Sequence, residues 1–257
     1  MGRQKLKILA ILAIVPFFFS WGFLTAYKEI FPYKLLKKVG VSDSSIYKDI
    51  DTFNDDKYWV EELSKGGYII HLRHAQREKW TDVTAFDAWE LSENIKAEDS
   101  SFHKAVCLTD QGDQEAELIG NIFNKANIRI SEVISSPSCR ARETAVLAFG
   151  EINRISNSLL HRTAMTVEQH NAMTAQLRKI IDEVSLEPGK NVVLSGHGGT
   201  LSNNIDLLID VNKVGELDDR DETGFIILSR NGDKVIAEYK YKSIWHFANA
   251  FIEFEIN

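Results

Sequence analysis

Residues 68–75 read Tyr-Ile-Ile-His-Leu-Arg-His-Ala, and this stretch decides the fold. An apolar run that stops at Arg73 and His74 is typical of a buried strand that ends at the edge of a sheet, where open α/β folds place their chemistry. His71 lies inside the apolar run, and we expect it to be a hydrogen-bonded core histidine. The stretch therefore predicts a central strand that delivers an arginine and a histidine to a site.

Two later segments repeat this pattern. The apolar run at residues 132–136 leads into Arg140, and the run at residues 191–195 leads into His197 between glycines. Because the ends of parallel strands meet at one edge of a sheet, the three segments predict a single pocket. The four side chains expected to line it are Arg73, His74, Arg140 and His197. Such a pocket suits a phosphate.

Composition narrows the possible functions. The chain has 257 residues, of which 44% are hydrophobic and 26% charged, and its net charge is −7. This charge argues against a nucleic-acid surface, which needs a basic face. The two cysteines, Cys107 and Cys139, are too few for a disulfide framework and lack the paired spacing of a zinc site. They could form one bridge, and the sequence leaves their pairing open.

The first part of the chain predicts a membrane anchor. Residues 8–27 form a run of 20 uncharged, mostly apolar residues, long enough to cross roughly 30 Å of hydrocarbon. A cleaved signal peptide is the alternative, although no convincing cleavage site follows the run. We expect residues 1–40 to be the anchor and its flanks, and residues 41–66 to be a linker with a short helix over 58–63. Lysines on both sides of the run leave the orientation open.

Residues 67–257 predict one α/β domain. Helical and strand patterns alternate, which favours a three-layer α/β/α sandwich with a mostly parallel central sheet. Thr109 is the expected N-cap of one helix, and a further helix is expected to start at Thr200 and to bury Leu208 and Ile209 on one stripe. The runs 225–229 and 234–239 predict a hairpin at the edge of the sheet.

The residue types of the pocket indicate phosphoryl transfer, which depends on positioning and on stabilising the charge of the phosphoryl oxygens. Arg73 and Arg140 would supply permanently charged donors. His74 is the expected nucleophile, because a neutral imidazole can attack phosphorus and form a phosphohistidine that water hydrolyses. His197 would hydrogen-bond the phosphoryl oxygens.

Four motifs occur in an order that resembles the histidine phosphatase, or phosphoglycerate-mutase-like, superfamily. They are Arg73-His74-Ala75, where the superfamily has Arg-His-Gly, then Leu-Thr-Asp-Gln-Gly at 108–112, Ser-Ser-Pro-Ser-Cys-Arg-Ala-Arg-Glu-Thr-Ala at 135–145, and Ser-Gly-His-Gly-Gly at 195–199. The resemblance implies that His74 is the nucleophile, that Arg73, Arg140 and His197 complete the phosphate pocket, and that no metal or organic cofactor is needed. The N-terminal run followed by Arg-His-Ala is also similar to membrane-anchored phosphatases of lipopolysaccharide core heptose. That likeness implies a single-pass protein with its catalytic domain on the periplasmic side.

One departure concerns the proton donor. Many members carry a carboxylate after the strand that follows the Arg140 helix, but residues 159–164 contain none. Glu168 is the nearest candidate donor, and a solvated helix start is its alternative role. Arg77 would either hold substrate charge or lie in solvent.

The expected activity is hydrolysis of a phosphorylated small molecule, glycolipid or phosphoprotein by a membrane-tethered phosphatase. The alternatives are a phosphate-binding scaffold with a degenerate site and a phosphomutase.

Overall fold

The computed structural model describes residues 45–78, 106–162, 165–201, 207–217 and 220–256. The chain divides into two compact units, residues 1–54 and 55–257, and the second holds every element discussed below except the start of α3. The strands are β1 (Ile69–Arg73), β2 (Ile130–Ser135), β3 (Arg154–Ile155), β4 (Asn191–Gly196), β5 (Ile209–Asp210), β6 (Phe225–Asn231) and β7 (Lys234–Tyr241). The helices are α3 (Ser45–Lys65), α6 (Asp110–Lys125), α7 (Cys139–Phe149), α8 (Val167–Glu183) and α10 (Ile244–Ile256), with short 3₁₀ turns η1 (Asn157–Leu159) and η2 (Gly198–Leu201).

The strands form one seven-stranded sheet in the order β3-β2-β4-β1-β6-β7-β5. The pairs β1–β4, β2–β4, β2–β3 and β5–β7 are parallel, and β6 runs antiparallel to both of its neighbours. The mostly parallel sheet expected from the sequence is confirmed. In the register of β1 and β4, Arg73 lies opposite Gly196, so the two strands end together.

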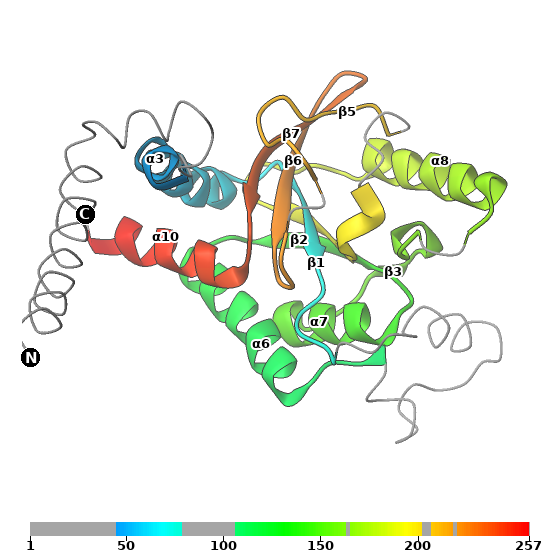
Figure 1. Cartoon of the computed structure of the whole chain (residues 1–257), viewed down its shortest axis with the longest axis horizontal. Coiled ribbons are helices and arrows are strands. Elements are labelled where there is room, and N and C mark those ends of the chain that lie inside the picture. Colours follow the sequence, from blue (N-terminus) through cyan, green and yellow to red (C-terminus); the bar gives the residue numbers. More distant parts are fainter. Residues whose placement is uncertain (1–44, 79–105, 163–164, 202–206, 218–219, 257) are drawn as a thin grey trace, which may run out of the picture. The chain divides into compact units, whose positions relative to one another are not determined.

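Helices cover both faces of the sheet (Figure 1). On one face, α3, α6, α7 and α10 pack on a core that includes Ile70, Leu72 and Phe225. On the other face, α8 packs on a core that includes Ile69 and Ile226. Neighbouring residues of a strand point to opposite faces, so the continuous apolar strands are buried on both sides. This is the predicted three-layer sandwich.

Helix α3 is longer than the short helix expected at 58–63. It spans 21 residues, and its last turns bury Trp59, Val60 and Leu63 in the first core. Asp56 of this helix is buried and accepts a hydrogen bond from the hydroxyl of Tyr239, while His246 Nε2 lies 3.0 Å from its Oδ2. These contacts join α3 to β7 and α10. The compact unit therefore begins at Asp55, whereas the sequence suggested a domain start at residue 67.

The segment after Gly196 differs from the prediction. The helix expected to bury Leu208 and Ile209 does not reach them, because Leu208 has a positive φ of 55° and Ile209 lies in β5. β5 pairs with β7, so the β6–β7 hairpin is confirmed but does not form the edge of the sheet. The spacing of a few apolar residues around Leu208 and Ile209 did not distinguish the buried face of a helix from a short strand.

The start of α6 is docked on the chain just after His74. Thr109 is the N-cap, as predicted, and its hydroxyl accepts a hydrogen bond from Gly112 N at 3.1 Å. Its own backbone N–H donates to Gln76 O at 3.1 Å. A Cβ on Gly112 would lie 2.1 Å from that same Gln76 oxygen, so only glycine permits this approach. The Leu-Thr-Asp-Gln-Gly motif thus fixes the segment that follows His74.

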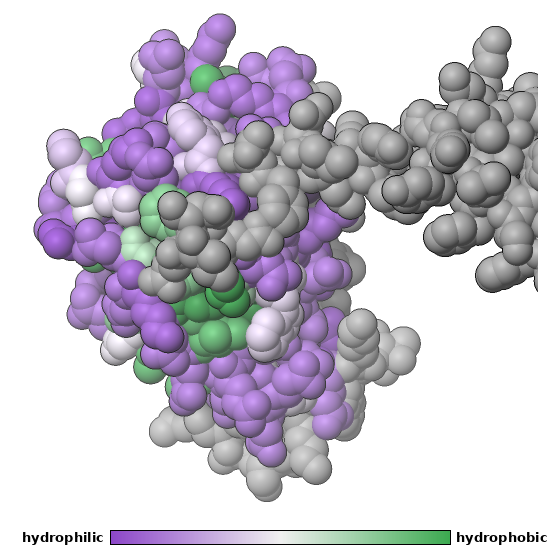
Figure 2. Space-filling model, turned by 90° about the vertical axis from the view of Figure 1, so that its left-hand side faces the viewer, coloured by the Kyte–Doolittle hydropathy of each residue, from purple (hydrophilic) through white to green (hydrophobic). Residues whose placement is uncertain are grey.

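The predicted membrane run at 8–27 lies outside the described residues. Of the helices in the described ranges, none is long and apolar enough to cross a bilayer. Figure 2 shows a face that is hydrophilic over most of its area, with apolar residues in several places and the largest apolar area near its centre. Among the described side chains of α10, Trp245, Ile252 and Phe254 are large, apolar and exposed.

Candidate active site

The ends of β1 and β4 and the start of α7 bring together side chains that are far apart in the sequence. His74 follows β1, and its backbone N–H donates to Gly196 O at 3.0 Å. The imidazole rings of His74 and His197 lie 5.2 Å apart between centroids, at an angle of 65°. Arg140 Nη2 lies 3.3 Å from His197 Nδ1. Arg73 Nη1 would lie 3.5 Å from a Cβ on Gly198, so its guanidinium rests against the glycine loop.

His74 is held in one tautomer. Its Nδ1 lies 2.8 Å from the carbonyl oxygen of Ala75, and a carbonyl only accepts, so Nδ1 carries the proton. Burial, followed by the positive charge of Arg140, lowers the pKa of His74 well below its usual value. The ring is therefore neutral at physiological pH, and Nε2 keeps the lone pair that a nucleophile needs.

His197 is also buried and neutral. A guanidinium only donates, so Arg140 must donate to His197 Nδ1, and Nε2 then carries the proton. That Nε2–H faces the hydroxyls of Ser136 at 3.1 Å and Ser138 at 3.2 Å. Burial, followed by the charge of Arg140, lowers the pKa of His197. In this arrangement His197 orients Arg140. For His197 Nδ1 to donate a hydrogen bond to phosphate, Nδ1 must gain a proton when Arg140 turns from His197 to the anion.

Arg140 is the second residue of α7 and is buried near the N-terminus of that helix, where free backbone N–H groups attract anions. Thr144, one turn later, donates its hydroxyl to Arg140 O at 2.7 Å and accepts from Ala75 N at 2.9 Å. Ser195 Oγ donates to Ala141 O at 2.9 Å. These bonds fix α7 against the segments that carry His74 and His197.

Arg220 is a site-supporting residue that the sequence reasoning missed. This buried guanidinium donates through Nη1 to His71 Nδ1 at 3.1 Å and to His71 O at 2.9 Å, and through Nη2 to Gly198 O at 3.1 Å. Its own carbonyl accepts from Arg73 Nη1 at 2.5 Å. His71 is accordingly a hydrogen-bonded core histidine. The surrounding acidic residues hid Arg220, because a cluster of that kind usually marks a solvated loop.

The two less certain site residues have different positions. Arg77 Nη1 donates to Glu78 O at 2.6 Å, and its charge contributes to lowering the pKa of His74. Glu168 is exposed in the first turn of α8, and hydrogen bonds from its own backbone N–H and then from Thr166 lower its pKa. This exposed position matches the solvated helix start that was the alternative role for Glu168.

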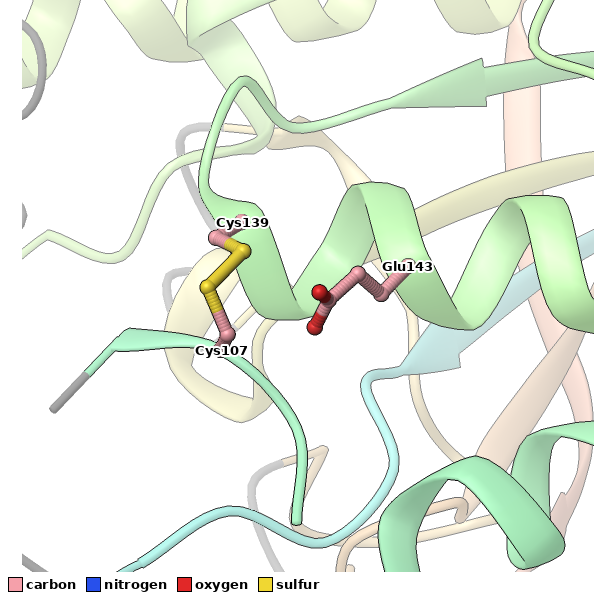
Figure 3. Close-up of side chains that lie close together, drawn as sticks. All are labelled: Cys107, Cys139 and Glu143. Atoms are coloured by element: carbon pink, nitrogen blue, oxygen red, sulfur yellow. A yellow bond between two sulfur atoms is a disulfide. The ribbon is translucent and has the colours of Figure 1, made fainter. Parts of the chain in front are cut away.

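A disulfide joins Cys107 to Cys139, and this answers the question that the sequence left open (Figure 3). Cys139 begins α7 directly before Arg140, so the bridge ties the helix that carries this arginine to a segment 32 residues earlier. Glu143, one turn further along, accepts from Leu108 N at 2.7 Å and fixes the same segment. In the described ranges these three residues are the one candidate metal-ligating group, and its two sulfurs are bonded to each other instead of being thiolates.

A hollow of about 260 Å³ opens beside Arg73. Its lining includes Gln76, Glu115, Thr223 and the exposed ring of Trp245. Glu115 accepts from Gln76 N at 3.2 Å and from Gln111 Nε2 at 3.1 Å, so both of its oxygens act as acceptors. Asp221 and Glu222 also line the hollow, so it is polar and acidic next to the guanidinium of Arg73. Of the four predicted pocket residues, only Arg73 lines it.

Comparisons with known proteins gave structural matches. No protein-family model matches the chain, and no curated protein matches it. Among solved structures, it is similar to a phosphoserine phosphatase mutant from Entamoeba histolytica in complex with phosphoserine, at 15% identity and a TM-score of 0.44, over 70% of this chain and 98% of that one. It is also similar to the protein histidine phosphatase SixA complexed with tungstate, at 16% identity and a TM-score of 0.43, over 68% and 96%. These structures belong to the histidine phosphatase superfamily, the superfamily that the four motifs resemble. The function proposed below rests on the residues of the site.

Proposed function

We propose that the protein is a phosphomonoesterase that works through a phosphohistidine on His74. The observation that carries this proposal is the hydrogen bond from His74 Nδ1–H to Ala75 O, which leaves a neutral Nε2 as nucleophile beside two arginines. Nε2 attacks phosphorus, Arg140 and Arg73 stabilise the charge on the phosphoryl oxygens, and water then hydrolyses the phosphohistidine.

The side chains and backbone groups of the site can carry out these steps themselves. Arg73 and Arg140 supply the positive charge, the N-terminus of α7 adds N–H donors, and His197 holds Arg140 in place. The burial of His74, His197 and Arg140 lowers the local dielectric and strengthens each of these interactions.

Tethering to a membrane on the extracytoplasmic side is part of the same proposal. The uncharged run at 8–27 supports an anchor, and the Cys107–Cys139 disulfide supports an oxidising compartment, where such bonds persist. An anchor would hold the site close to a bilayer, and this position favours a phosphorylated sugar, free or on a lipid, as the substrate class.

The first experiment compares the full-length chain with its His74→Ala variant. The wild-type protein is expected to hydrolyse 4-nitrophenyl phosphate and to carry acid-labile, base-stable phosphate after rapid quenching. The variant should lose both. Full turnover by His74→Ala would refute the mechanism, whereas stable phosphate binding without turnover by the wild type would favour the scaffold alternative. Transfer of the bound phosphate to a second alcohol would favour a mutase.

A further inference from the structure

Hydrolysis of an alkyl phosphate needs a proton donor, because an alkoxide is a poor leaving group and general acid catalysis contributes about 10²–10⁴-fold. The carboxylates considered so far do not supply it. Glu168 is exposed and has a lowered pKa. Glu115 is occupied by N–H bonds that it accepts on both oxygens, from Gln76 N and Gln111 Nε2. His74 is the nucleophile, and His197 is engaged with Arg140 and the serines.

One more imidazole lies at the site. The ring of His161 is 5.2 Å from that of His197 between centroids, at 86°, which is an edge-to-face contact. His197 makes a similar contact with His74, so the ring of His197 contacts both other imidazoles. A phosphate ester bound at Arg140 and His197 would therefore lie beside a ring, that of His197, which contacts both the attacking ring of His74 and the ring of His161.

The backbone before His161 is fixed to the same end of the sheet. Ser156 N donates to Ser135 O at 2.8 Å, and Thr200 Oγ1, in the glycine loop, donates to Leu159 O at 3.3 Å. Leu159 and Leu160 are both buried. His161 as a residue is half-buried, whereas its Nδ1 is shielded from solvent. The ring therefore lies at the boundary between the site and the surface, a position that suits a group that must donate and regain a proton.

We propose that His161 is the proton donor to the leaving-group oxygen and the base that activates water. The proposal deepens the phosphatase function given above and rests on it. In the first step, His74 Nε2 bonds to phosphorus, the ester P–O bond breaks, and the departing oxygen takes a proton from the His161 imidazolium. In the second step, neutral His161 takes a proton from water as the water oxygen bonds to phosphorus. The N–P bond then breaks and returns its electron pair to Nε2.

The test varies the leaving group in the full-length protein. It measures kcat/KM for 4-nitrophenyl phosphate, whose phenolate leaves without a proton, and for glycerol 2-phosphate, whose alkoxide needs one. His161→Gln is expected to lower kcat/KM at least about 100-fold on glycerol 2-phosphate and less than about tenfold on the aryl ester. Because the same variant lacks the base, phosphohistidine should accumulate at steady state. His161→Glu should recover at least about a tenth of the lost alkyl activity.

His170→Gln on α8 is the matched control and should leave the ratio of the two substrates unchanged. An equal loss on both esters in His161→Gln, or no rescue by His161→Glu, would overturn the role of His161 while the phosphatase function stands. Turnover by His74→Ala, or none by the wild type, would instead overturn the phosphatase function. Circular dichroism of each variant separates a loss of fold from a loss of proton transfer.

Discussion

The Nδ1 atom of His74 lies 2.8 Å from the carbonyl oxygen of Ala75, and this contact decides which ring nitrogen can attack. The next residue in the chain supplies the acceptor, so the tautomer is set by local backbone geometry. Burial and Arg140 then keep the ring neutral. In the proposed mechanism, the nucleophile is therefore already in its attacking tautomer before substrate binds.

The tautomer and charge of His74 can be measured directly. In nuclear magnetic resonance spectra of protein labelled with ¹⁵N in the imidazoles, His74 should show a protonated Nδ1 and an unprotonated Nε2 from pH 8 down to below its usual pKa of about 6.5. Arg140→Gln removes the positive charge that contributes most to lowering the pKa of His74 and should raise that pKa. Arg178→Gln is the control, because it removes the charge of an arginine on α8 that donates a hydrogen bond to Asp182. A His74 ring that is doubly protonated at pH 7 would contradict the neutral nucleophile.

Stability should fall in mild acid. His71, His74 and His197 are buried, and burial lowers the pKa of each below its usual value. The unfolded chain therefore binds more protons than the folded protein once the pH drops below about 6.5, and each histidine costs up to about 1.4 kcal/mol per pH unit there. The stabilisation is present above that pH and is lost as the pH falls. Urea unfolding between pH 7.5 and 5.5 measures the slope, which should be smaller in His71→Gln; a flat profile would contradict the prediction.

Arg220 should be needed for both stability and activity. Arg220→Lys keeps a positive charge but cannot reach His71 and Gly198 O together, so unfolding free energy should fall by about 2–4 kcal/mol. The Arg220 side chain anchors the backbone whose carbonyl accepts from Arg73, so loss of that anchor should displace Arg73 and lower kcat/KM as well. Arg230→Lys is the control. The guanidinium of Arg230 also donates to two backbone carbonyls, those of Ile181 and Asp182, but lies away from the site. Unchanged kcat/KM in a folded Arg220→Lys would show that Arg73 is placed without it.

The disulfide should stabilise the folded chain. Closing a loop between residues 32 apart restricts the unfolded state by about 3–4 kcal/mol in the chain-entropy account. Dithiothreitol should therefore lower the free energy of unfolding of the wild type by roughly that amount. The double variant Cys107→Ser, Cys139→Ser should be equally destabilised and no longer respond to dithiothreitol. If reduction leaves the unfolding curve unchanged, the two cysteines are not paired in the purified protein.

The sequence determined the layers of the fold and the four central residues of the site. Apolar runs that end in Arg or His predicted β1 and β4, and the helical patterns between them predicted the sandwich. Four residues could be named because each stands at or just after the end of a strand or at the start of a helix: Arg73, His74, Arg140 and His197. Position along an element is a local property of the sequence.

Tertiary structure alone decided the contacts that make these residues useful. Three contacts join residues that no periodic pattern relates: the pairing of Cys107 with Cys139, the hydrogen bonds of Arg220 to His71 and Gly198, and the approach of His161 to His197. Local propensity also failed at Ile209, where pairing with β7 outweighed the helical stripe. Periodicity reports which face of an element is buried, but the partners on that face are fixed only when the elements pack together.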